Sequence, residues 1–130
     1  MKSSVFKSSG DKSSDLIFVN LVVHLFAATH ALVCMYLRLK GIDDGIFLTI
    51  LTLLMIILLI NFFNGTTDVF VSLSLLSLLA GFYLGTKGAD LFALAFPNSP
   101  VLTHVLATIA VTEILGWMVF FILRKRLIKR

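Results

Sequence analysis

The sequence predicts an all-α integral membrane protein with four transmembrane helices in an up-down arrangement and both termini in the cytoplasm. Of its 130 residues, 58% are hydrophobic and only 14% are charged, whereas a soluble domain carries about 25% charged residues. The hydrophobic residues form four long stretches, and the lysines and arginines gather at the two ends of the chain. A closed barrel, the other architecture that spans a bilayer, needs an alternation of polar and apolar residues that these stretches lack.

The predicted spans cover residues 16–39, 46–63, 69–86 and 101–123. Each is close to the length of about 20 mostly apolar residues that a helix needs to cross a bilayer. The segments outside this four-helix domain are predicted to be a disordered cytoplasmic tail (1–15) and a basic cytoplasmic tail (124–130).

Local signals define the ends of these spans. A serine or an aspartate at residues 14–15 is expected to cap the first helix. Gly41 begins a polar turn before the second span, and the glycines of residues 85–88 are expected to end the third. Residues 91–96 are apolar but too short to cross, so an interfacial helical turn is expected there. Pro100 suits the first turn of the fourth helix.

The orientation follows from the distribution of basic residues. Eight of the eleven lysines and arginines lie on the side of the two termini and three on the other side, which predicts cytoplasmic termini. The basic residues after the last span are expected to anchor the chain on anionic lipid, and they are Arg124, Lys125, Arg126, Lys129 and Arg130. The pattern predicts a bacterial cytoplasmic (inner) membrane protein whose first partner is the lipid bilayer, with no nucleic-acid binding.

Glu113 is the only acidic residue inside any predicted span. Its position lies within about 2 Å of the bilayer centre, where a charge costs about 2.5–3.5 kcal/mol. A bound proton or a partner must offset this cost, and His24 and His30 lie at depths from which either could reach it. These three residues are the predicted site for a proton, a cation or a small polar ligand. The alternative is a structural hydrogen bond between helices.

The neighbours of Glu113 on its own helix suggest a second subunit. Leu106, Ile109, Trp117 and Phe120 share its face and are all bulky. Because acids inside membranes seldom face lipid, this arrangement favours a homo-oligomer or another membrane protein that contacts Glu113.

Small residues form a stripe on the third span at helical spacing, and they are Ser74, Ser77, Gly81, Gly85 and Gly88. Inside lipid, small residues let helix backbones approach closely. The stripe therefore predicts a helix–helix contact, and a polar track lined by serine hydroxyls is the alternative.

Polar side chains on the first span offer further contacts. Asn20, His24, Ala28 and Ala31 share one face, which is expected to point into the bundle with Asn20 as a hydrogen-bonding group. His30 is rotated away from this face, so it turns either toward another subunit or toward a local partner.

The fourth and second spans differ in polarity. The polar face of the fourth span consists of His104, Thr108 and Thr112. The two threonines are expected to form hydrogen bonds between helices. His104 is expected to be solvated near the outer interface. The second span has only Thr49 and Thr52 as polar side chains, so it is expected to face lipid and to contribute no chemistry.

No catalytic residue, metal site or cofactor is predicted, and the chain is not expected to be an enzyme. The single cysteine, Cys34, has no second thiol to pair with. A haem between two histidines is disfavoured because His24 and His104 differ in depth by about 17 Å. The sequence therefore predicts an oligomeric transport or ligand-binding module that uses Glu113. The alternative is a non-catalytic accessory, anchoring or sensing subunit of a larger membrane complex.

Overall fold

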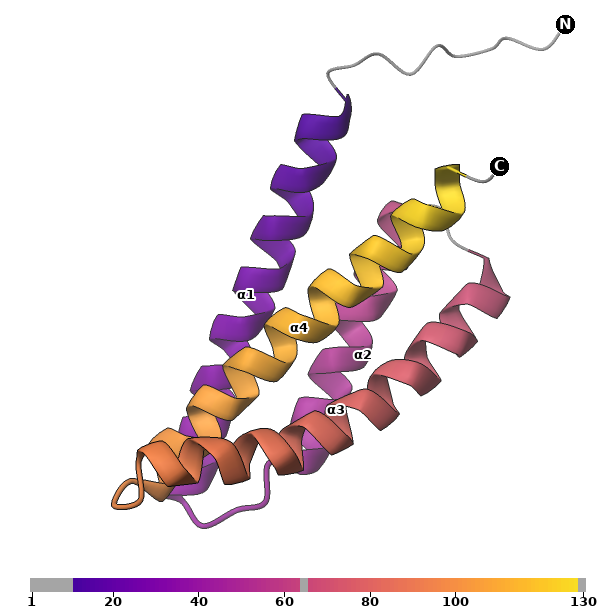
Figure 1. The fold of residues 1–130 in the computed structure, drawn as a ribbon. Helices are drawn as coiled ribbons and strands as arrows, with labels where there is room; N and C mark the ends of the chain where they lie inside the picture. The colour runs from indigo at the N-terminus through magenta and orange to yellow at the C-terminus, as the bar shows by residue number, and fades with distance from the viewer. Residues whose placement is uncertain (1–10, 64–65, 129–130) are drawn as a thin grey trace, which may run out of the picture.

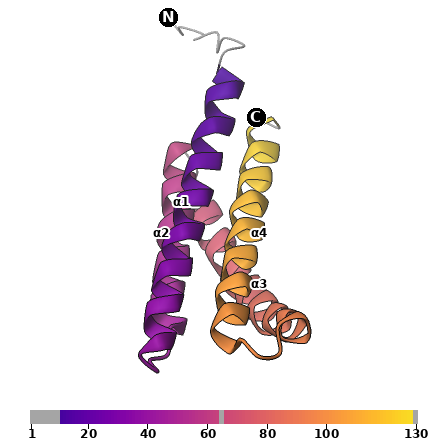
Figure 2. The same cartoon turned by 90° about the vertical axis from the view of Figure 1, so that its left-hand side faces the viewer.

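The computed structural model describes residues 11–63 and 66–128 and contains four long helices (Figure 1). They are α1 (Asp11–Leu39), α2 (Gly45–Phe62), α3 (Thr67–Ala95) and α4 (Pro100–Ile128). Each is long and apolar enough to cross a membrane. The all-α prediction is therefore confirmed, and the four helices are candidate membrane spans packed in a bundle. The start of α1 and the end of α4 lie at the same end of the bundle (Figure 2).

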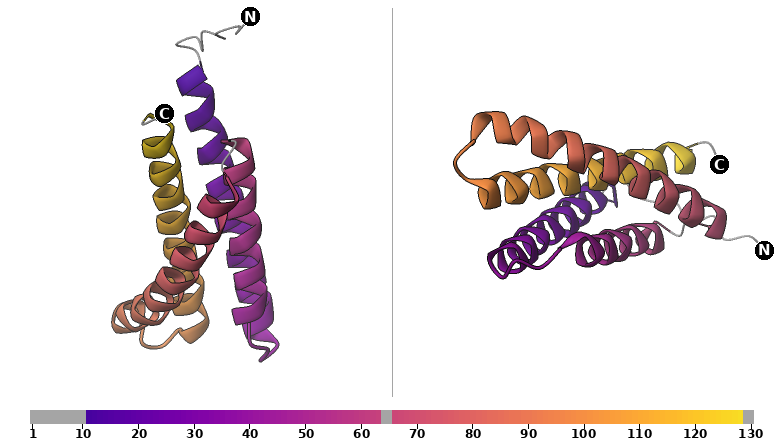
Figure 3. Two further views of the ribbon diagram at one scale, coloured as in Figure 1. Left: turned by 90° about the vertical axis from the view of Figure 1, so that its right-hand side faces the viewer. Right: turned by 90° about the horizontal axis from the view of Figure 1, so that it is seen from below.

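Helix α4 organises the packing, because it contacts each of the other three helices and α1 most extensively. Within the described residues, α1 and α3 do not contact each other. Helix α3 crosses the bundle obliquely, and its second half runs beside the start of α4, away from α1 (Figure 3).

The half of the bundle that carries the chain ends has an apolar core. Its members come from all four helices and are Val19, Val22, Val23, Met55, Ile56, Leu59, Ile60, Phe63, Val69, Leu73, Leu115, Val119, Phe120 and Leu123. The other half, next to the α1–α2 turn, is more polar and contains the cavity described below. The two ends of the molecule therefore differ in chemistry.

The inward face of α1 is not the one that the sequence analysis expected. Val23 and Ala27 are buried, whereas Asn20, His24 and Ala28 are exposed on the surface of the single chain. The reason is that the valine face of α1 packs against α4. This leaves the more polar face outside.

Three helix ends also differ from the expected boundaries. Helix α3 does not stop at residues 85–88 but continues to Ala95, so residues 91–96 do not form a separate turn. A glycine ends a helix by adopting positive φ. Among the described glycines only Gly41, which follows α1, does so, with φ 69°. Helix α1 already includes residues 11–15, and α4 runs to Ile128 into the expected basic tail.

Candidate functional site

A cavity of about 500 Å³ lies between α2, α3 and α4 and is bordered by the last turns of α1. Its volume falls within the range of about 300–1,000 Å³ that is usual for small-molecule sites. Apolar side chains such as Leu48, Leu78 and Val111 form part of the wall. The remaining wall is polar and comes from all four helices.

Four threonines line the cavity, and each has already used its hydroxyl proton. Thr49 and Thr52 of α2 and Thr112 of α4 each donate to the backbone carbonyl one turn earlier, at 2.8 Å. Thr108 donates to the Cys34 sulfur at 3.7 Å. Because a hydroxyl has one proton and two lone pairs, these side chains offer acceptor capacity rather than donors to the cavity.

His30 borders the cavity from α1 and is buried. Its Nδ1 lies 2.7 Å from the Phe26 carbonyl oxygen, and its Nε2 lies 3.2 Å from the Leu48 carbonyl oxygen and 3.3 Å from the Thr52 hydroxyl. His30 is expected from the sequence to turn either toward another subunit or toward a local partner, and the structure shows local partners, the carbonyl oxygens of Phe26 and Leu48. The side chain joins α1 to α2 and does not reach Glu113.

Ser77 of α3 is 0% exposed and lines the cavity, and its Oγ has no hydrogen-bond partner within the described part of the chain. A buried polar atom without a partner costs about 1–3 kcal/mol. A molecule in the cavity that pairs with Ser77 would remove that cost. Ser74 is also buried and unpartnered, but it is not part of the cavity wall.

The small-residue stripe of α3 divides between packing and cavity wall. A Cβ on Gly81 would lie 3.3 Å from Leu115 of α4, and one on Gly88 would lie 4.0 Å from Ala107 of α4. Gly85 meets nothing within 4 Å and borders the cavity. The glycines of the stripe that have contacts therefore face α4, and Ser77, Gly81 and Gly85 border the cavity.

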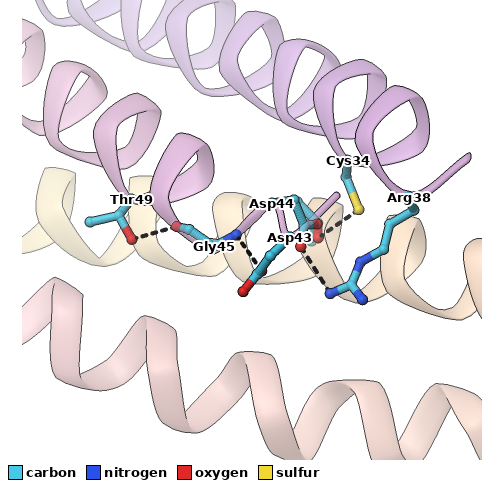
Figure 4. A network of polar contacts seen from close by, with 7 residues as sticks. Cys34, Arg38, Asp43, Asp44, Gly45 and Thr49 are labelled. Carbon is cyan, nitrogen blue, oxygen red and sulfur yellow. Dashed lines mark hydrogen bonds and ion pairs between the residues drawn. The ribbon is translucent and has the colours of Figure 1, made fainter. Parts of the chain in front are cut away.

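Charged side chains surround the cavity at the α1–α2 turn (Figure 4). Arg38 Nη2 lies 2.9 Å from Asp44 Oδ1, and Asp44 is only 3% exposed. Asp43 is exposed and accepts a hydrogen bond from the Gly45 backbone N–H at 3.0 Å. We call Arg38, Asp43 and Asp44 the mouth cluster.

The electrostatics of the mouth cluster favour an ionised Asp44. Burial by itself raises the pKa of this carboxyl group. Hydrogen bonds from the Cys34 thiol, from its own backbone N–H and from Arg38, together with the positive charge of Arg38, outweigh burial, so the pKa lies below its ordinary value.

Glu113 lies outside the cavity, on the surface formed by α1 and α4. Its Oε1 is 3.7 Å from His24 Nδ1, and its Oε2 accepts a hydrogen bond from Trp117 Nε1 at 3.3 Å. The side chains of His24 and Glu113 are 61% and 27% exposed. The structure thus brings Glu113 together with His24 but separates both from His30.

The basic residues at the end of α4 are described in part. Arg124 lies over the Phe120 ring, 6.0 Å from its centroid, and both Arg124 and Lys125 are exposed. Lys129 and Arg130 lie outside the described residues, as does the side chain of Arg126.

Sequence reasoning missed several residues of the cavity. The sequence pattern assigns no role to Arg38 or Asp44, predicts that His104 is solvated and predicts that α2 contributes no chemistry, yet all of these contribute to the wall. The spacing of Thr49 and Thr52, which places them on one helix face, is the signal that could have found the α2 part of the cavity.

Comparisons of the chain with protein-family models, with curated proteins and with solved structures find no match.

Proposed function

We propose that this small multi-pass membrane protein is an oligomeric ligand-binding or transport module. Its ligand is a small polar molecule that enters the cavity between α2, α3 and α4. With the termini in the cytoplasm of a bacterial cell, the mouth cluster faces the outer side of the inner membrane.

The Ser77 hydroxyl is the observation that carries this proposal. It is fully buried, unpartnered within the described residues and part of a cavity wall that also holds four threonines. Polar groups inside the hydrocarbon region of a membrane cost free energy unless they pair with one another or face a cavity that polar molecules enter. A transient polar occupant explains why these groups surround a space instead of packing together.

We assign Glu113 the proton-handling role and His24 the role of its partner. The two side chains lie close enough for an ion pair when His24 is protonated. Thr112, the neighbour of Glu113 in the sequence, faces the cavity. Helix α4 therefore carries the proton site and the ligand site on different faces, and a movement of this helix would couple them.

Cysteine accessibility tests the ligand site. Ser77→Cys, in a Cys34→Ser background, is expected to react with a small hydrophilic methanethiosulfonate reagent in sealed vesicles, because the cavity admits polar molecules. Ser74→Cys is the matched control, since it is buried one turn away and outside the cavity wall. Equal, negligible labelling at both positions would contradict the proposal.

Proton flux tests the role of Glu113. In vesicles that contain a trapped pH-sensitive dye, the protein is expected to acidify the interior after an acid pulse, and Glu113→Gln to abolish this flux. Asp90→Asn, at an exposed acid on α3, is the control. Unchanged flux in Glu113→Gln would remove Glu113 from the mechanism.

A second candidate function, an accessory or anchoring subunit, is favoured by the position of His24. A polar side chain that is 61% exposed on a membrane helix is well placed to contact another helix. This candidate predicts a complex with a different membrane protein in mild detergent, whereas the first predicts only copies of this chain. The molar mass from light scattering separates the two.

A further inference from the structure

We infer that the cavity takes a compact organic cation, namely a primary ammonium group on an apolar body. This inference rests on the proposed function and names the ligand class of the same site. It follows from the hydrogen-bonding capacity of the wall, the charges of the mouth cluster and the apolar surface between them.

The wall is rich in acceptors and poor in donors. Thr49, Thr52 and Thr112 donate to helix carbonyls, and Thr108 donates to sulfur, so their lone pairs are what remains for a ligand. An ammonium group has three donors and no acceptor. It is therefore the complement of such a surface, and the free Ser77 oxygen adds one more acceptor.

The mouth cluster carries one more negative charge than positive charge. Arg38 and Asp44 pair with each other at 2.9 Å, and Asp43, held only by a backbone N–H, is left with an uncompensated charge. His30 and His104 also border the cavity. His30 has oxygen partners for both ring nitrogens, whereas the half-buried His104 brings a ring N–H donor. The mouth cluster by itself attracts a cation.

An anion fits this site poorly. Among the described residues, the buried donor at the cavity without a partner, apart from the Ser77 hydroxyl, is Arg38 Nε. An anion that approached it would lie beside the carboxylates of Asp43 and Asp44, whose repulsion opposes binding.

The apolar part of the wall sets the shape of the ligand. Leu48, Leu78, Val111 and Leu115 border the same space as the threonines, so a hydrocarbon body can be buried there while the ammonium group faces the acceptors. A volume of about 500 Å³ accepts a single ring or a short chain.

Three probes of equal shape and different charge test the inference, namely benzylammonium, benzyl alcohol and benzoate. They are titrated by calorimetry into the full chain in nanodiscs of zwitterionic lipid. Benzylammonium is expected to bind at least about tenfold more tightly than benzyl alcohol, which corresponds to a difference of about 1.4 kcal/mol in binding free energy. Benzoate is expected not to bind. Benzyl alcohol or benzoate binding as tightly as benzylammonium would overturn the inference.

Variants locate the binding. Asp43→Asn and Ser77→Ala are each expected to weaken the binding of benzylammonium about fivefold. This is the effect of losing one exposed charge contact or one hydrogen bond. Ser72→Ala, at an exposed serine on α3, leaves this binding unchanged. Equal affinity in all three variants would place the probe elsewhere and overturn the inference.

The result of the probe titrations can be distinguished from the result of the cysteine-labelling test of the proposed function. If Ser77→Cys reacts with the hydrophilic reagent while benzylammonium does not bind, the cavity is accessible and the ligand class is wrong. If Ser77→Cys does not react, the ligand site itself is wrong.

Discussion

Gly116 of α4 lies against Val23 of α1 so closely that a Cβ atom on Gly116 would be 2.6 Å from Val23 Cγ2 and 2.9 Å from its Cγ1. No side chain other than hydrogen fits without a shift of one of the helices. This contact lies in the interface of α1 and α4, the most extensive helix pair of the bundle. It also sets the surface on which His24 meets Glu113.

Replacing this glycine is expected to destabilise the bundle. Gly116→Ala should lower the free energy of unfolding by about 1–3 kcal/mol, the usual cost of overpacking, because the branched Val23 side chain has no room to retreat. Unfolding in detergent mixtures, followed by circular dichroism, measures this change.

Gly85→Ala is the matched control, because a Cβ there meets nothing within 4 Å. It should leave stability unchanged or raise it by up to about 1 kcal/mol, as alanine favours a helix. Equal effects of the two substitutions would show that α1 and α4 do not approach as described.

The single tryptophan of the chain reports on Glu113. Trp117 donates its indole N–H to the Glu113 carboxylate at 3.3 Å, so removal of this acceptor changes the surroundings of the indole. The fluorescence emission maximum of Glu113→Ala is therefore expected to shift relative to that of the wild-type protein.

Asp44→Asn serves as the control for that comparison, because it removes an acid remote from Trp117 and should leave the emission maximum unchanged. An emission maximum of Glu113→Ala identical to that of the wild type would separate the indole from the carboxylate.

Acid should weaken the cavity mouth through Asp44. Its pKa lies below the ordinary value of 3.8, since the hydrogen bonds and the charge of Arg38 outweigh burial. The ionised group therefore stabilises the folded protein above pH 3.8, and this contribution is lost as the pH falls through the lowered pKa. Thermal unfolding of the wild type in this acid range should show a steeper loss of stability than that of Asp44→Asn.

Arg38→Gln extends this experiment. It removes the ion pair and one hydrogen bond, so the pKa of Asp44 should rise toward its ordinary value and the loss of stability should begin at a higher pH. An onset unchanged by Arg38→Gln would contradict the described mouth cluster.

The sequence by itself determined which segments cross the membrane. Long apolar runs bounded by polar turns have no other stable arrangement in lipid, and α2 at Gly45–Phe62 agrees with the expected 46–63 to within one residue at each end. Helical periodicity also placed Thr108 and Thr112 on one helix face, and both border the cavity. Thr108 bonds to α1, whereas Thr112 bonds its own helix and not a neighbouring one as expected.

Only the tertiary structure decided which faces point inward. In lipid no hydrophobic contrast separates a leucine face from its surroundings, so helices associate where backbones approach closely. The contact of Gly116 with Val23 turned the valine face of α1 toward α4 and left Asn20 and His24 outside. The oblique course of α3 (Figure 3) goes with the position of Ser77, Gly81 and Gly85 at a cavity shared with α2. Such relations depend on distances between helices, which a pattern along one helix does not contain.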